Sequence, residues 1–146
     1  MKPSLLVVGV AVVLMAAWSI GRVQGQQEQG KKVIFVSADQ ASFTEMPGGG
    51  TSMAAIWGDV NQGAHGTFTK FTPGFDAGMH THTNDVWIVV VKGAYLYKDD
   101  AREKRVGPGD FLRVPGGHKH WSGGDKKDGA VSYEESSGKF DSIPAK

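Results

Sequence analysis

Four of the five histidines in this chain form two His-x-His pairs, His80 with His82 and His118 with His120. Side chains on a strand alternate between its faces, so the members of each pair share one face wherever the backbone is extended. Neutral imidazole binds divalent transition metals, and the chain has no cysteine to add a thiolate. We therefore predict that these four histidines hold a divalent transition metal, with iron, manganese, nickel, copper and zinc all left open.

The segments that must position these histidines are short and apolar. Seven of them follow one another from residue 32 on: KVIFV, MAAIW, GTFTKF, VWIVVV, AYLY, FLRV and AVSY. Short apolar segments between turn residues are typical of strands, and the 21 glycines are typical of the turns between them. No segment after residue 25 keeps apolar residues at helical spacing over three turns. The sequence predicts one all-β domain, a sandwich or barrel, over residues 26–146.

One hairpin is expected within residues 86–106, VWIVVVKGAYLYKDDAREKRV. Its first strand runs through Tyr97, the chain turns within the charged run KDDAREKR, and the second strand returns toward Val106. Because the opposite charges of that run nearly cancel, we interpret it as a solvated tip and not as a binding patch.

The first 25 residues have the pattern of a secretory signal peptide: Lys2, the apolar run LLVVGVAVVLMAA, and the small-residue exit VQG. The apolar run is shorter than the roughly 20 residues that a membrane-spanning helix needs. We expect cleavage after Gly25, which leaves a periplasmic or secreted protein with no membrane attachment. The alternative is an uncleaved N-terminal anchor, because Trp18 and Ile20 prolong the apolar run.

The charge balance argues against nucleic acid as a partner. The formal net charge is +1, and removing residues 1–25 takes away two positive charges, Lys2 and Arg22, and no negative one. The remaining chain is close to neutral and shows no basic patch of the kind that nucleic acids or anionic membranes attract. Since the chain has no cysteine, it forms no disulfide, and an exported protein of this kind depends on packing and on any metal it holds.

The residues around both histidine pairs resemble the two motifs of the cupin superfamily. The matching positions are Gly74, His80, His82 and Gly93 in the first motif, and Gly109, Pro115, Gly116, Gly117 and His120 in the second. The resemblance implies a cupin-type jelly roll, a double-stranded β-helix of two sheets. It also implies a metal held by His80, His82 and His120 together with a glutamate. Similar small cupins often dimerise, so we expect a homodimer.

The glutamate of the first motif is absent from this chain, and Val86 stands in its place. Two residues are candidates to replace it. Asp85 is adjacent, but regular strand phase points it away from His80 and His82, so a bulge would be needed to bring it round. His118 is in phase with His120 and offers a fourth nitrogen instead.

Two classes of function fit these residues. The first is a metal-dependent enzyme, dioxygenase-like or isomerase-like, that acts on a small polar molecule, with His118 as a fourth ligand or a proton-transfer group. The second is a non-catalytic module that binds or senses a ligand or a metal. The fifth histidine, His65, stands between glycines in NQGAHGTF, and we expect it in an exposed turn.

Overall fold

The computed structural model describes residues 32–146. The chain divides into two units, Met1–Phe35 and Val36–Lys146, and every strand of the described residues lies in the second unit. The expected signal peptide and its cleavage after Gly25 lie outside the described residues. The first apolar segment, KVIFV, forms no strand, contrary to expectation. Within residues 32–146 the chain forms no helix with the length and hydropathy needed to cross a bilayer.

A six-stranded antiparallel sheet forms one layer of the fold. Its order is β1-β2-β3-β10-β5-β8, so the late strand β10 lies between β3 and β5. The strands are β1 (Thr44–Glu45), β2 (Thr51–Gly58), β3 (His65–Phe71), β5 (Val86–Gly93), β8 (Phe111–Val114) and β10 (Ala130–Ser136).

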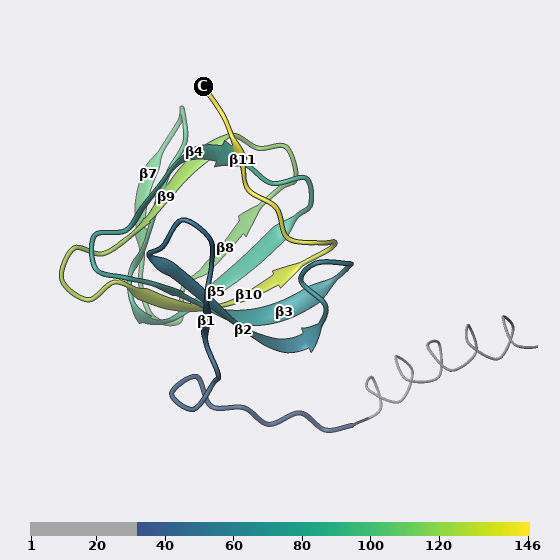
Figure 1. Cartoon of the computed structure of the whole chain (residues 1–146). Helices are drawn as coiled ribbons and strands as arrows, with labels where there is room; N and C mark the ends of the chain where they lie inside the picture. Colours follow the sequence, from purple (N-terminus) through teal and green to yellow (C-terminus); the bar gives the residue numbers. More distant parts are fainter. Residues whose placement is uncertain (1–31) are drawn as a thin grey trace, which may run out of the picture. The chain divides into compact units, whose positions relative to one another are not determined.

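A five-stranded antiparallel sheet forms the second layer and faces the first (Figure 1). Its order is β11-β4-β9-β6-β7. The strands are β4 (Asp76–Thr81), β6 (Tyr95–Lys98), β7 (Glu103–Val106), β9 (His120–Gly124) and β11 (Ile143–Pro144). The expected all-β jelly roll of two sheets is confirmed, and the two histidine motifs contribute neighbouring strands, β4 and β9.

The expected hairpin is correct at its tip and wrong at its start. β6 pairs with β7 across the charged turn, with Tyr95 opposite Val106. The strand that was expected to run through Tyr97 is instead broken at Gly93, because the chain passes there from β5 in one sheet to β6 in the other. Gly93 has a φ of 68°, and an added Cβ would lie 2.2 Å from the carbonyl oxygen of Gly129. Only glycine fits this crossing.

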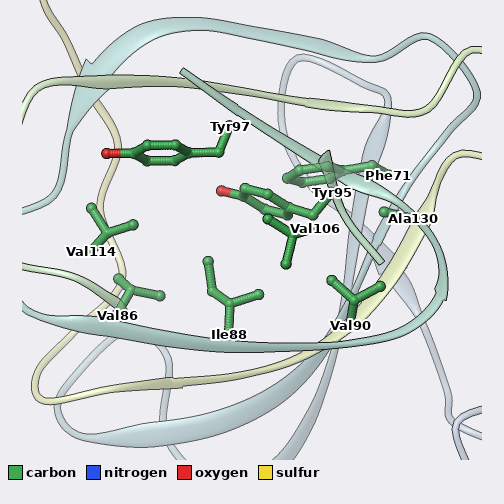
Figure 2. Close-up of a cluster of buried hydrophobic side chains, with 9 residues drawn as sticks. All are labelled: Phe71, Val86, Ile88, Val90, Tyr95, Tyr97, Val106, Val114 and Ala130. Atoms are coloured by element: carbon green, nitrogen blue, oxygen red, sulfur yellow. The ribbon is translucent and has the colours of Figure 1, made fainter. Parts of the chain in front are cut away.

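The hydrophobic core lies between the two sheets. Figure 2 shows three residues of β5, Val86, Ile88 and Val90, pointing to the same side of the strand, toward Tyr95 and Tyr97 of β6. Alternate residues of β5 share a face, as strand geometry requires. The core also contains Phe71, Val106, Val114 and Ala130. Three of these core residues, Val86, Ile88 and Tyr95, also line the interior cavity that contains His80 and His120.

Candidate metal centre

Two adjacent strands bring His80 and His120 together. His80 on β4 lies directly opposite His120 on β9, and their ring centroids are 4.3 Å apart. His82 follows on the same face just beyond the end of β4, with its ring 4.9 Å from that of His80 and 5.4 Å from that of His120. The structure thus places three of the four paired histidines in one cluster.

The backbone fixes the tautomer of all three rings. Nδ1 of His80 donates to the carbonyl of Gly78 at 2.8 Å, and Nδ1 of His120 donates to that of His118 at 3.0 Å. Nδ1 of His82 donates to the carbonyl of Asp141 at 2.5 Å. A carbonyl oxygen only accepts, so each Nδ1 carries the proton and each Nε2 keeps its lone pair. In metal sites, the ring nitrogen that does not bind the metal is usually held by such a hydrogen bond.

The three rings offer ligand atoms that lie within 4.8 Å of one another. Among the described residues, Nε2 of His120 is the one fully buried side-chain nitrogen or oxygen without a hydrogen-bond partner. An unpaired buried polar atom is costly, and a metal ion would remove that cost by accepting its lone pair. The donor set and its geometry therefore fit a divalent transition metal.

Burial favours the neutral form of two of the three imidazoles, those of His82 and His120. Desolvation lowers the pKa of His120 to about 4, although the bond to the His118 carbonyl opposes the shift. Desolvation also lowers the pKa of His82, against the effect of the Asp141 carbonyl. A metal binds only the neutral form of imidazole, so the lowered pKa values of His82 and His120 favour metal binding at neutral pH.

The cluster opens into a cavity of about 470 Å³ between the two sheets. Val86, which stands where the resemblance requires glutamate, lines the same cavity as the three histidines. The chain turns between β4 and β5, so Val86 reaches the cavity from the opposite sheet and not from a continuous strand shared with His80 and His82. The cavity wall also includes Met53, Phe75, Ile88, Tyr95 and Phe140, so much of its surface is apolar.

Neither candidate for the missing carboxylate joins the cluster. Asp85 accepts hydrogen bonds from Arg113 at 2.6 Å and from the backbone of Gly116 at 2.8 Å, at the surface. His118 is 41% exposed, and its Nε2 lies 3.2 Å from Oδ2 of Asp99 and 3.0 Å from the hydroxyl of Tyr97. His118 therefore contributes to the cluster through its backbone carbonyl, which accepts a hydrogen bond from Nδ1 of His120.

Two residues of the cavity differ from what the sequence indicated. His65 was expected in an exposed turn, but it begins β3 and is 3% exposed, because the sheet covers it. Glu134 on β10 was not identified as a candidate, yet it lines the cavity. Its segment, SYEES, carries polar residues on both faces. The alternation of polar and apolar residues therefore did not indicate which face points into the fold. Counting by twos from buried Ala130 would have placed Glu134 on the inner face.

Comparisons with known proteins agree with this fold and with the motifs. Residues 67–132 match the Cupin domain family. This match covers β5 and β9 and includes all three clustered histidines. No curated protein matches the chain.

Solved structures of similar fold include KdgF from Halomonas sp., at 21% identity and a TM-score of 0.58, with 72% of this chain and 94% of that one covered. The polyketide cyclase RemF from Streptomyces resistomycificus is similar at 15% identity and a TM-score of 0.63, with 79% and 87% covered. An RmlC-like cupin from Shewanella frigidimarina is similar at 21% identity and a TM-score of 0.57, with 73% and 92% covered. At these identities the likeness shows the fold alone.

Proposed function

Since the chain belongs to the cupin superfamily and three imidazoles converge inside its jelly roll, we propose that it is a metal-dependent enzyme acting on a small polar molecule. The observation that carries the proposal is the buried, unpartnered Nε2 of His120 beside two imidazoles whose tautomers present the same atom. In this proposal His80, His82 and His120 hold iron, manganese, nickel, copper or zinc. All of these metals accept imidazole nitrogen.

The bound metal would supply a Lewis acid that polarises an oxygen of the substrate. The chain's own residues do the rest. The carbonyls of Gly78, His118 and Asp141 hold the three rings in orientation. Val86 and the other apolar residues of the wall limit the water that reaches the cluster. A small molecule enters the remaining space, and its polar end faces the imidazoles.

Catalysis is favoured over simple binding by the open side of the site. Structural metal sites are usually closed by four protein ligands, whereas catalytic sites keep a free position. Here three ligands border a cavity large enough for a small substrate. The fold is compatible with catalysis, since the polyketide cyclase RemF has it. The competing function is a non-catalytic module that binds a ligand or a metal, and a metal-loaded protein that converts none of the molecules it binds would favour it.

His118 takes a positioning role in this proposal. Its ring interacts with Asp99 and Tyr97, and its carbonyl orients His120. The earlier assignments of His118 as a fourth ligand or a proton-transfer group stay predictions, and these contacts do not favour them. Export to the periplasm or the medium also stays a prediction, because it depends on the pattern in residues 1–25.

Alanine variants test the metal site. The wild-type protein, loaded with Zn²⁺ and desalted, is expected to retain about one ion per chain, and His80→Ala and His120→Ala should each retain none. His65→Ala is the matched control. His65 is as buried as His80, and its Nδ1 also bonds a backbone carbonyl, but it lies on the other sheet. Elemental analysis gives the metal content, and equal loss in all three variants would contradict the proposed site.

A further inference from the structure

A polar row on the inner face of the six-stranded sheet remains outside the proposed metal site. Three alternate residues of the central strand β10, Ser132, Glu134 and Ser136, form this row. Ser136 lies opposite Val86 of β5, and Glu134 lies opposite Ile88, one step further along the same face. Glu134 thus lines the cavity beyond Val86, on the sheet that faces the histidines.

Glu134 is surrounded by hydroxyl groups and lacks a cationic partner. Its Oε1 accepts a hydrogen bond from the hydroxyl of Ser132 at 2.7 Å, and Thr67 and Thr69 on β3 join each other at 3.2 Å beside it. The cavity lining contains no lysine or arginine, and Glu134 forms no ion pair within residues 32–146. Glu134 is half-buried and lines the cavity.

The raised pKa of Glu134 agrees with a carboxylate whose hydrogen-bond acceptors are only partly satisfied. Desolvation raises the pKa of its carboxyl, and hydrogen bonds from Ser132 and Thr69 offset only part of that effect. A buried carboxyl is stabilised by any further donor that reaches it. The carboxyl receives hydrogen bonds from Ser132 and Thr69 and faces no lysine or arginine in the cavity wall, so it keeps acceptor capacity for a donor on a ligand in the cavity.

We propose that Glu134 is the second anchor of the cavity, accepting a hydrogen bond from the hydroxyl or ammonium group of a small molecule whose anionic oxygen end lies at His80, His82 and His120. This inference rests on the proposed function for the position of the oxygen end. It defines the substrate class as a dipolar molecule, with an acidic oxygen at one end and a hydrogen-bond donor at the other. The two ends match the two polar walls of the cavity.

Three carboxylic acids with the same three-carbon chain test the donor requirement. Propanoate has no distal donor, 3-hydroxypropanoate has a hydroxyl group, and β-alanine has an ammonium group. Calorimetric titration into the Zn²⁺-loaded wild-type protein is expected to show both substituted acids binding about tenfold more tightly than propanoate, since a hydrogen bond to a charged group adds about that factor. Equal binding of all three acids, or binding of none, overturns the inference.

Two variants assign the preference to Glu134. Glu134→Gln keeps an oxygen that can accept a hydrogen bond from the ligand's hydroxyl group, and it removes the charge. The tighter binding of β-alanine relative to propanoate should therefore disappear, while that of 3-hydroxypropanoate stays. Glu134→Leu should remove both advantages. Glu103→Gln is the matched control, because Glu103 is an exposed residue of β7, and it should behave as the wild type. A preference that survives in Glu134→Leu overturns the inference, and if that variant does not fold, the Glu134→Gln result still decides for the ammonium group.

The same experiment separates this inference from the proposed function. Metal content is measured on every sample before titration. If the wild type takes up no metal, the proposed function fails, and the three acids are then titrated into the metal-free protein. A preference for the substituted acids there, lost on substitution of Glu134, upholds the second anchor without the metal. A metal-loaded protein without that preference overturns only the anchor.

Discussion

Val86 is the residue at which this chain departs most clearly from the metal site of its superfamily. It is buried in the cavity wall, between Ser136 of β10 and Val114 of β8. An aliphatic side chain there cannot coordinate a metal. Val86→Glu is therefore expected to add a carboxylate ligand and to lower the apparent dissociation constant for Zn²⁺ by about tenfold or more, as one added ligand charge contributes a kcal/mol or above.

The measurement for Val86→Glu is competition with a metal chelator, side by side with the wild type. Val89→Glu is a suitable control, because Val89 lies on the opposite face of the same strand and is 37% exposed. That variant should leave metal affinity unchanged. A folded Val86→Glu protein with wild-type affinity would show that the side chain at this position does not reach the cluster.

Strand parity was enough to place His80 and His82 on one face, but it did not predict that the ring of His118 lies outside the cluster, against Tyr97 and Asp99. Parity also gave no information on what orients the rings. His80 and His120 are held by carbonyls only two residues away, whereas the acceptor for His82 is the carbonyl of Asp141, 59 residues away. Every residue has a carbonyl, so no residue type signals such a contact. The burial of His65 could not be predicted for a related reason. The flanking glycines of that segment indicated a turn, and its burial depends on the pairing of distant strands.

At the scale of elements, the central strands were predictable from their apolar runs and the sheets they join were not. Six of the seven expected segments lie in strands. The break at Gly93 was missed because VWIVVVKGAYLY reads as one apolar run, and only the close approach of Gly129 reveals the crossing. The two-residue strands β1 and β11 were missed as well, because they form by pairing with β2 and β4 and carry little pattern of their own.

The C-terminal segment is the element whose role in the site can be tested most directly. It crosses from β10 to β4 (Figure 1). Within this segment the carbonyl of Asp141 accepts a hydrogen bond from Nδ1 of His82. Removing residues 141–146 takes away that acceptor and frees the ring to rotate. We expect the affinity for Zn²⁺ to fall by about 10-fold to 100-fold, the usual cost of losing a partner that orients a ligand.

A shorter deletion provides the control. Removing residues 143–146 eliminates β11, which pairs with β4 at Thr81 and His80, but keeps Asp141. Chelator competition on both proteins should show the larger loss in the longer deletion. If the two deletions lower affinity equally, the effect belongs to β11 and not to the carbonyl of Asp141.

At the scale of the whole molecule, the outer face of the six-stranded sheet bears on assembly. Val89, Val91 and Phe111 are 37%, 36% and 63% exposed, and Val89 lies opposite Phe111 where β5 pairs with the edge strand β8. Exposed apolar surface beside a sheet edge is usually covered by a partner. We expect a homodimer by light scattering at micromolar concentration, and a monomer for Phe111→Arg. A wild-type mass equal to one chain contradicts this prediction.

The stability of the metal-free protein should depend on pH through the histidine cluster. The pKa of His120 falls from 6.5 to about 4 on folding, so between these values the unfolded chain binds a proton that the folded protein does not. Stability is therefore complete above pH 6.5 and is lost as the pH falls toward 4. The lowered pKa of His82 acts in the same direction, and the raised pKa of Glu134 opposes it.

Urea unfolding of chelator-treated protein at pH 7 and pH 5 measures this dependence. The free energy of unfolding should fall by about 2 kcal/mol for the wild type over that interval, given 1.36 kcal/mol for each pH unit below 6.5. His120→Gln does not titrate at this position, so its free energy should change less, whatever its absolute stability. The lowered carboxyl pKa values of Asp76 and Asp125 act only below about pH 4 and leave the interval undisturbed. Equal slopes for the two proteins would mean that His120 accepts a proton in the folded state as readily as in the unfolded one, and that burial does not keep this imidazole neutral.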